Sequence, residues 1–418
     1  MIHYKNTTLE NGLEIYTLPV NKKSGVISVD IFYKVGSRNE KMGKSGIAHM
    51  LEHLNFKSTK NLKAGEFDEI VKGFGGVDNA STGFDYTHYF IKCSSENLDK
   101  SLWLFAELMR NLNLKDDEFQ PERDVVLEER RWRTDNNPLG YLYFRLYNHA
   151  FLHHPYHWTP IGFFKDIQNW SIEDIKEFHQ TFYQPKNAIL LVSGDINEDE
   201  VFNLAKKHFH DIKNTKTIPI VHEKEPEQDG AKRIILHKES DTQLLALAYK
   251  IPAFNHEDIP KLCALSELLG NGKSSLISKI LIDKLELINE FYAYASENID
   301  ENLFIFICVC NEGIKAEDVE KELLKILDDV KNAKFDDTIM EKIKNTVKSD
   351  FIFSLSNASS VANIYGSYLA RGDLKPLLDY EKNIKNLSKD DLIHCAKKYF
   401  NENKSTTIIL KKRGENGQ

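Results

Sequence analysis

Two segments of this 418-residue chain lie 217 positions apart and share one order of residue types. The first is DIQNWSIEDIKEFHQTFYQPKNAILLVSGDI, from Asp166, and the second is NIKNLSKDDLIHCAKKYFNENKSTTIILKKR, from Asn383. In each, a serine with an aspartate three positions later, typical of a helix N-terminus, precedes an amphipathic helix pattern and an apolar strand pattern. Many helix–strand units share part of this pattern, but agreement over the whole length favours an internal duplication.

The polar stretch NTKTIPIVHEKEPEQDG, residues 214–230, separates the two copies and has two prolines and no apolar period. We therefore predict an N-terminal domain at 1–213, a linker at 214–230 and a homologous C-terminal domain at 231–418. Each half opens with strand patterns and then alternates helix patterns with hairpin-like strands. This order predicts an α+β fold in which each domain has a mainly antiparallel sheet with helices packed on one face.

The composition excludes several classes of protein. The formal net charge is −8 and no basic stripe with interleaved aromatic residues occurs, so we expect no nucleic-acid partner. No window of about 18 apolar residues occurs, so we expect no membrane span and no membrane partner. The chain start lacks the pattern of a signal peptide and the five cysteines lie scattered, mostly in apolar runs, which favours reduced core residues and a cytoplasmic location.

The stretch GIAHMLEHLNFKST, residues 46–59, carries His49, Glu52 and His53 in an otherwise apolar helix pattern. On an α-helix these three side chains share one face, because positions four apart are separated by only about 40°. Two histidines at this spacing can chelate one zinc ion, and the glutamate can take a proton from a zinc-activated water. A helix face with two hydrogen-bonded histidines and a surface acid is the alternative reading of so short a pattern.

The second copy of the repeat does not carry these histidines. A shift of 215 positions places Ala264, Glu267 and Leu268 at the three motif positions. If this register holds, one helix was duplicated and only its first copy has the histidines. That difference favours a functional role for the histidines over a packing role.

A catalytic zinc ion needs a third protein ligand, and the helix pattern QPERDVVLEERRWRTDNNP is a candidate for its source. We place Pro121 in the first turn of this helix and DNNP at its end. Glu122 and Glu129 are seven positions apart and share one face, whereas Glu128 points about 100° away. Acids in so arginine-rich a helix also form surface ion pairs, and spacing alone does not choose between Glu128 and Glu129.

The pattern H-x-x-E-H, with a glutamate 76 positions after its second histidine, resembles the inverzincin arrangement of the pitrilysin and mitochondrial-processing-peptidase family of zinc metallopeptidases. The segments EHLNFKST, GGVDNASTGFDYTHYF, ERDVVLEE, HPYHWTPIG and YQPKNAILLVSGD resemble landmarks of that family in the same order. The resemblance covers nearly the whole chain and extends to the bacterial two-domain type of subunit that bears zinc. It implies the LuxS- and processing-peptidase-like metallohydrolase fold.

The resemblance also implies a set of functional residues. One zinc ion per chain would be held by His49, His53 and Glu129, which settles the choice of Glu129 over its neighbour. The chain would be a zinc metalloendopeptidase with Glu52 as general base, and Glu122 would belong to the catalytic set because it orients a ligating histidine. The expected substrates are extended, unfolded peptides or proteins.

The segment GGVDNASTGFDYTHYF also has an interpretation that does not depend on the family resemblance. Gly75 and Gly76 permit a sharp entry, and the alternating residues after Asn79 suit a strand. By resemblance, this strand is a sheet edge that pairs with the substrate backbone, and Asn79 and Ala80 contact the peptide. A plain hairpin is the alternative.

The sequence departs from the family pattern in its second half. Many single-chain relatives carry an arginine and a tyrosine seven positions apart there, and an ungapped alignment places Ile282 and Asn289 at those positions. No arginine occurs between Arg233 and Arg371. The chain therefore reads as the zinc-bearing half of a dimeric clamp whose homologous partner supplies the Arg/Tyr pair. The alternatives are a homodimer with other contacts, a slow peptidase, and a non-catalytic peptide-binding or assembly subunit.

Overall fold

The computed structural model describes residues 2–413. The described chain forms two compact units, and neither is a single stretch of sequence. The first unit comprises the residues up to 128 with 158–223 and 352–377, and the second comprises 129–157, 224–351 and the residues from 378 on. The change of unit at residue 224 lies inside the predicted linker, whereas the two exchanged segments, 129–157 and 352–377, were not predicted.

The first unit is built around a six-stranded sheet with the strand order β1-β2-β6-β3-β5-β4. Strands β2 and β6 are parallel, and each other neighbouring pair is antiparallel. The strands are β1 Lys5–Thr8, β2 Glu14–Pro19, β3 Val26–Tyr33, β4 Val77–Thr82, β5 Thr87–Ser94 and β6 Ala188–Gly194. The helices are α1 Ile47–Asn55, α2 Glu66–Gly73, α3 Leu98–Asn111, α4 Asp116–Arg130, α6 Phe164–Asn169, α7 Ile172–Phe182, α8 Glu198–Phe209, α12 Ala358–Arg371 and α13 Lys375–Leu378.

The second unit is built around a five-stranded sheet with the strand order β7-β11-β8-β10-β9. Strands β7 and β11 are parallel, and the other neighbouring pairs are antiparallel. The strands are β7 Lys232–Lys238, β8 Leu244–Ile251, β9 Ile288–Ala295, β10 Asn302–Cys310 and β11 Ser405–Lys412. The helices are α5 Pro138–Ala150, α9 Ile259–Gly270, α10 Ala316–Lys331, α11 Thr338–Ser354, α14 Tyr380–Asn386 and α15 Lys389–Tyr399.

The two sheets have the same topology once β1 is set aside. Strands β2, β6, β3, β5 and β4 correspond, in order and in pairing direction, to β7, β11, β8, β10 and β9. Ser171 and Ser388 are the N-caps of α7 and α15, and each forms a capping box with the aspartate three positions later. The predicted α+β fold of two homologous, mainly antiparallel domains is therefore confirmed.

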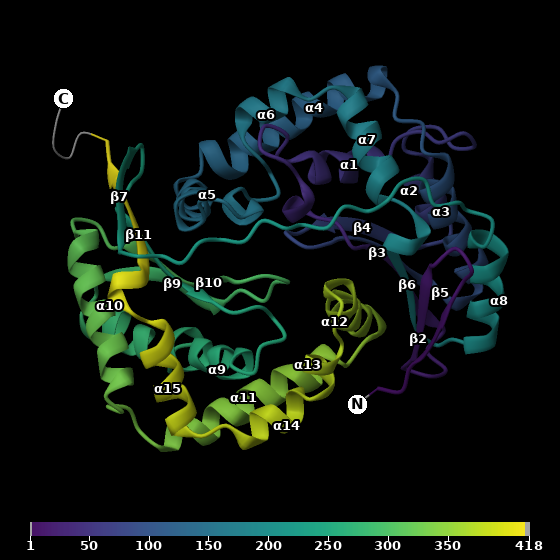
Figure 1. Ribbon diagram of the computed structural model, residues 1–418. Coiled ribbons are helices and arrows are strands. Elements are labelled where there is room, and N and C mark those ends of the chain that lie inside the picture. Colours follow the sequence, from purple (N-terminus) through teal and green to yellow (C-terminus); the bar gives the residue numbers. More distant parts are fainter. Residues whose placement is uncertain (1, 414–418) are drawn as a thin grey trace. The chain divides into compact units, whose positions relative to one another are not determined.

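Each unit receives helical structure from the other half of the sequence: α12 and the short α13 belong to the first unit, and α5 belongs to the second. Helix α12 packs against β3 and β6, and in Figure 1 this yellow-green helix lies beside strands of the first unit. Its residue Ala358 accepts a hydrogen bond from Ser193 of β6, on the face opposite the apolar core that contains α1. Helix α5 packs against β8 and β11 of the second unit in the same way. We predicted helices on one face of each sheet. That prediction was incomplete, because α12 and α5 cover part of the other face.

Helix α4 begins at Asp116, so the prediction that Pro121 lies in its first turn is wrong. Three consecutive acids from Asp116 to Glu118 form the first turn, where the helix dipole favours negative charge, and Pro121 lies within the helix. A π-helical turn continues from Arg131 to Asp135 before Asn137 caps α5. The predicted end of the helix at DNNP is therefore correct.

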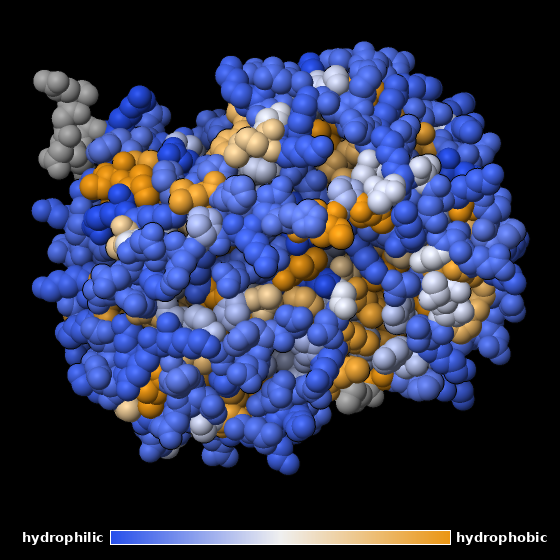
Figure 2. Space-filling view, viewed as in Figure 1, coloured by the Kyte–Doolittle hydropathy of each residue, from blue (hydrophilic) through white to orange (hydrophobic). Residues whose placement is uncertain are grey.

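No helix within residues 2–413 combines the length and the apolar composition needed to cross a lipid bilayer. On the face shown in Figure 2, hydrophilic residues cover most of the surface and hydrophobic residues form scattered groups.

We expect Gly366→Ala to destabilise the first unit by about 1–3 kcal/mol because it overpacks the contact between α12 and β3. A Cβ atom at this position would lie 2.1 Å from Cε2 of Phe32. The Phe32 ring is fully buried and stacked on His88 at a centroid distance of 3.9 Å, so it has little room to move. In an ordinary helix interior, replacing glycine by alanine raises the free energy of unfolding, because alanine has the higher helix propensity. Here we expect the opposite change.

Urea denaturation of the full chain measures this effect. The exposed residue Asn363 of the same helix offers a control, since Asn363→Ala should change the free energy of unfolding by less than about 0.5 kcal/mol. A gain in stability for Gly366→Ala would contradict the packing described here.

Candidate metal centre

Helix α1 presents the motif residues on its one face that is not fully buried. The helix begins at Gly46, an N-cap with φ of +88°, and its apolar residues enter the core of the first unit. His49, Glu52 and His53 are each half-buried on the remaining face. The predicted helix and its shared face are therefore present.

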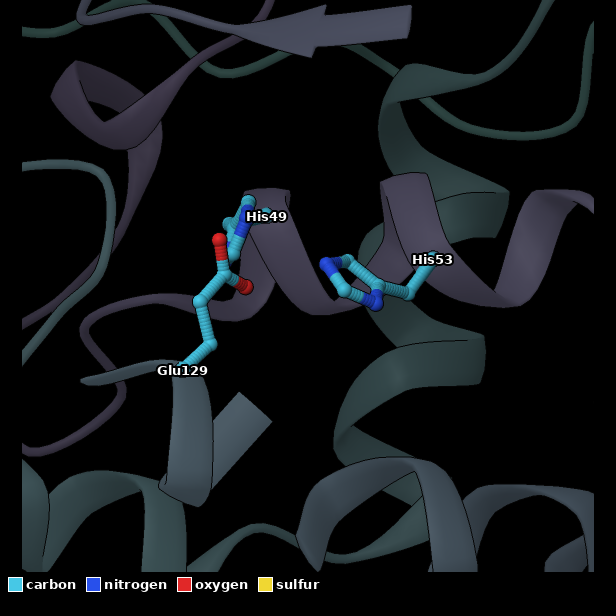
Figure 3. Close-up of side chains that lie close together, drawn as sticks. All are labelled: His49, His53 and Glu129. Atoms are coloured by element: carbon cyan, nitrogen blue, oxygen red, sulfur yellow. The ribbon is translucent and has the colours of Figure 1, made fainter. Parts of the chain in front are cut away.

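His49, His53 and Glu129 form a cluster in which one possible ligand atom from each residue lies within 4.8 Å of the others. Within residues 2–413 no other three histidine, cysteine or acidic side chains come together in this way. The centroids of the two imidazole rings are 4.7 Å apart, and the ring planes meet at 79°. Figure 3 shows the Glu129 carboxylate beside the His49 ring, with the His53 ring pointing toward both. Glu129 is the penultimate residue of the continuous helix α4.

Glu122 holds the His53 ring from the side away from this cluster. Nδ1 of His53 lies 2.8 Å from Oε1 of Glu122, and Nζ of Lys57 lies 2.6 Å from Oε2 of the same carboxylate. Burial raises the pKa of Glu122, but the hydrogen bonds from His53 and Lys57 outweigh this effect and hold the pKa below its ordinary value. The carboxylate therefore favours the tautomer with the proton on Nδ1, which leaves Nε2 as the ligand atom.

The two adjacent glutamates of helix α4 have different surroundings. Glu129 is half-buried in the cluster, and its Oε1 lies 2.9 Å from Nε of Arg133, one turn later. Glu128 is exposed, and it is not a member of the cluster. The structure thus brings together the residue that the family resemblance selected and leaves out its neighbour.

Glu52 lies between the histidines in sequence and contacts the edge strand β4. Its carboxylate accepts a hydrogen bond from the hydroxyl of Thr82, the last residue of that strand. Asn79 is exposed and Ala80 is half-buried on the same strand, and β4 forms the edge of the sheet. Thr82 lies in the segment singled out from the sequence, but no residue pattern there indicated its contact with Glu52.

The chemistry of the cluster fits a zinc ion. Two imidazole nitrogens and one carboxylate oxygen are the donor set of catalytic zinc sites, which keep a fourth position for water or substrate. A carboxylate on the second nitrogen of a ligating histidine, as Glu122 provides for His53, is the usual outer partner of such a ligand. The three residues of the cluster are therefore the ones that would hold the ion.

The matching helix of the second unit supports this reading. Helix α9 carries Ala264 and Leu268 at the positions of the two histidines, and both side chains are buried in the apolar core. Ile282 lies in the π-helical turn Ser278–Lys284, and Asn289 lies in β9. In the second unit, the two positions that carry histidines in α1 therefore contribute to the packing of the core.

We expect Glu122→Gln to weaken zinc binding by about 10- to 100-fold, because the amide no longer holds His53 with a charged acceptor. Competition with a chromophoric chelator measures the affinity. Asp117→Asn, at an exposed position in the first turn of the same helix, is the control and should leave the affinity unchanged. Equal affinities for the wild type and Glu122→Gln would contradict the role of this carboxylate.

Two family models match the chain, the insulinase model of peptidase family M16 over residues 17–156 and the peptidase M16 inactive domain over residues 169–347. A curated protein is 54% identical over 411 residues, which cover 98% of this chain and 93% of that protein. The chain therefore belongs to peptidase family M16. That relative is named zinc protease PqqE, from Helicobacter pylori.

Two further likenesses extend this result. The crystal structure of a protease from Helicobacter pylori superposes with a TM-score of 0.97 at 55% identity, covering 98% of this chain and 99% of that one. The mitochondrial-processing peptidase subunit beta of Lentinula edodes is 25% identical over 408 residues, covering 94% of this chain and 87% of that protein. The relationship to pitrilysin and the processing peptidases that the sequence suggested is confirmed.

Proposed function

We propose that this chain is a zinc-dependent endopeptidase that hydrolyses peptide bonds of extended, unfolded peptides. The observation that carries the proposal is the convergence of His49, His53 and Glu129 beside Glu52. The names of the relatives support a zinc protease at the level of the family. The assignment of roles to individual residues rests on the family resemblance together with their geometry.

In this proposal, one set of residues binds the metal ion and another residue positions a ligand. His49, His53 and Glu129 would hold the ion, and Glu122 keeps the His53 ring in position. Zinc bound there would lower the pKa of a water molecule and polarise the scissile carbonyl.

Glu52 lies on the same helix face as the histidines, where it can accept a proton from a water molecule and return it to the leaving amine. The hydroxyl of Thr82 holds one oxygen of this carboxylate and so limits its rotation. No covalent bond between protein and substrate is needed for this sequence of proton transfers.

Strand β4 is the part of the site suited to a peptide. An edge strand offers unpaired backbone N–H and C=O groups, and an extended peptide can pair with them without regard to most of its side chains. Asn79 and Ala80 lie on this strand, and Thr82 at its end contacts Glu52. A peptide paired with β4 would therefore run toward the proposed base, which favours unfolded substrates over folded ones.

The second candidate is a zinc-bearing subunit that is inactive alone. Ile282 and Asn289 stand where the resemblance leads us to expect an arginine and a tyrosine that contact the substrate. A partner subunit with that pair would complete the site of a heterodimer, whereas a homodimer would use other contacts. A non-catalytic peptide-binding or assembly subunit is the remaining reading, and the presence of all the zinc-site residues argues against it.

The test uses the purified full chain with a quenched library of random peptides and with a folded protein as comparison. About one zinc ion per chain, together with cleavage of the library but not of the folded protein, would support the proposal. Zinc without cleavage would favour the subunit that needs a partner, and a homologue carrying the Arg/Tyr pair should then restore activity. A chain that binds no zinc would overturn the proposal.

A further inference from the structure

We propose that Glu40 is a positioning residue of the metal centre, because its buried carboxylate fixes the N-terminus of helix α1 and with it the two histidines. This inference rests on the proposed function of the site. Glu40 follows the short 3-10 turn Ser37–Asn39 and lies outside the motif helix. Only 6% of the residue is exposed.

The carboxylate of Glu40 accepts two backbone hydrogen bonds at the start of α1. Its Oε2 accepts from the N–H of Gly46 and its Oε1 from the N–H of Ala48, each at 2.8 Å. The first N–H groups of a helix have no partner within it and are usually satisfied by the side chain of the N-cap residue. Here the N-cap is a glycine, so a residue six positions earlier provides the acceptor.

The N-cap position cannot carry a capping side chain of its own. A Cβ atom at Gly46 would lie 2.8 Å from the backbone oxygen of Ile161 and 2.8 Å from Cζ2 of Trp170. The preceding residue, Ser45, is held in turn by Asp166 through its N–H at 3.0 Å and its hydroxyl at 2.6 Å. At this helix start, Glu40 therefore supplies the acceptor that a side chain at the N-cap position would otherwise provide.

The position of this helix start determines where the histidines lie. His49 is the third residue of α1, directly after Ala48, and His53 follows one turn later. A small rotation or shift of the first turn therefore moves both imidazoles relative to Glu129, which lies on another helix. Metal sites tolerate errors of only about 0.5 Å in such placements, so the anchoring of α1 should affect affinity for the ion.

A buried carboxyl group is costly, and the second copy of the repeat uses its buried acid differently. Asp258, the buried N-cap of α9, accepts hydrogen bonds from the side chains of Lys261, Lys398 and Tyr399, and its side chain makes no cap hydrogen bond with the helix. Burial raises the pKa of Glu40, whereas the N–H groups of Ala48 and Gly46 lower it because they stabilise the ionised carboxylate, whose two oxygens both accept. The offset of 215 positions that aligns the two copies places Asn255 at the position of Glu40, and Asn255 is exposed. A buried carboxylate that accepts from the N–H groups of the helix start thus occurs in the copy that carries the histidines, whereas the buried Asp258 of the other copy binds lysine side chains instead.

The test is the zinc affinity of Glu40→Gln in the full chain, measured by competition with a chromophoric chelator. Glutamine has the same shape, but it turns an NH₂ group toward one of the two N–H donors. We expect the affinity to fall by about 10- to 100-fold, as for other outer partners of metal ligands. We also expect the absorption spectrum of the cobalt-substituted protein to change, since this spectrum reports the geometry of the ligands.

Asp30→Asn is the matched control. Asp30 is 1% exposed on β3 of the same unit, where its carboxylate accepts hydrogen bonds from Ser28 and His88. The control should be less stable than the wild type, but it should keep the zinc affinity within about twofold and leave the cobalt spectrum unchanged. A loss of stability alone therefore does not reproduce the effect expected for Glu40→Gln.

The outcomes separate this inference from the proposed function. Wild-type affinity and an unchanged cobalt spectrum in Glu40→Gln would overturn the inference while the proposed function stands. A wild-type chain that binds no zinc would overturn both. If Glu40→Gln does not fold, Glu40→Asp replaces it: its shorter side chain cannot reach both N–H groups at 2.8 Å, and wild-type affinity there would equally overturn the inference.

Discussion

Glu52→Gln is expected to lower peptide cleavage by about 10²- to 10⁴-fold while the zinc content stays at the wild-type level. The amide keeps the size of the side chain and its contact with Thr82, but it cannot accept the proton from water. Neither ligand histidine is changed, and Glu52 is not a member of the ligand cluster. The rate of cleavage of a quenched peptide library and the zinc content by elemental analysis are measured on the same sample.

Glu69→Gln is the control for this experiment. Glu69 is exposed on helix α2 of the same unit, and its substitution should leave both the rate and the zinc content unchanged. Cleavage at the wild-type rate by Glu52→Gln would contradict the role of Glu52 as general base. Loss of zinc together with activity would place Glu52 among the ligands.

Glu129→Gln is expected to weaken zinc binding by more than about 100-fold, which is the upper end of the loss seen for outer partners of metal ligands. The substitution removes the only negative charge among the three members of the cluster. Zinc should then be lost on dialysis against a chelator under conditions in which the wild type retains it.

The neighbouring residue provides a control that differs by one position. Glu128→Gln carries the same chemical change on the same helix, but Glu128 is exposed and lies outside the cluster. Its zinc content should equal that of the wild type. Full occupancy in Glu129→Gln, or equal losses in the two variants, would contradict the assignment of the third ligand.

Much of the fold follows from local patterns in the sequence. The serine–aspartate pairs at 171 and 388 mark two helix starts, and both form the capping boxes that their spacing indicates. The exchange of α5 and α12 could not be predicted in this way. An amphipathic helix shows which of its faces is apolar, but it does not show which of two similar sheets that face will cover.

The same distinction holds for the metal centre: local spacing predicts some of its residues, and contacts between separate elements bring in the others. Helical spacing placed His49 and His53 on one face, yet only the family resemblance chose Glu129, because its side chain comes from a helix far away in sequence. Thr82 and Glu40 were missed. Thr82 acts through one contact with a side chain 30 positions away, and Glu40 acts through hydrogen bonds from the backbone N–H groups six and eight positions later. Neither kind of contact leaves a periodic pattern in the sequence.

The exchanged helices have a consequence for the origin of the chain. A protein made of one copy of the repeat could not cover the second face of its own sheet with α5 or α12 in the arrangement seen here, since each of these helices packs on the sheet of the other half. Two such copies could do so by trading helices, as in a domain-swapped homodimer. Joining the two genes would have made that association permanent, and one copy could then lose its histidines while the other kept them.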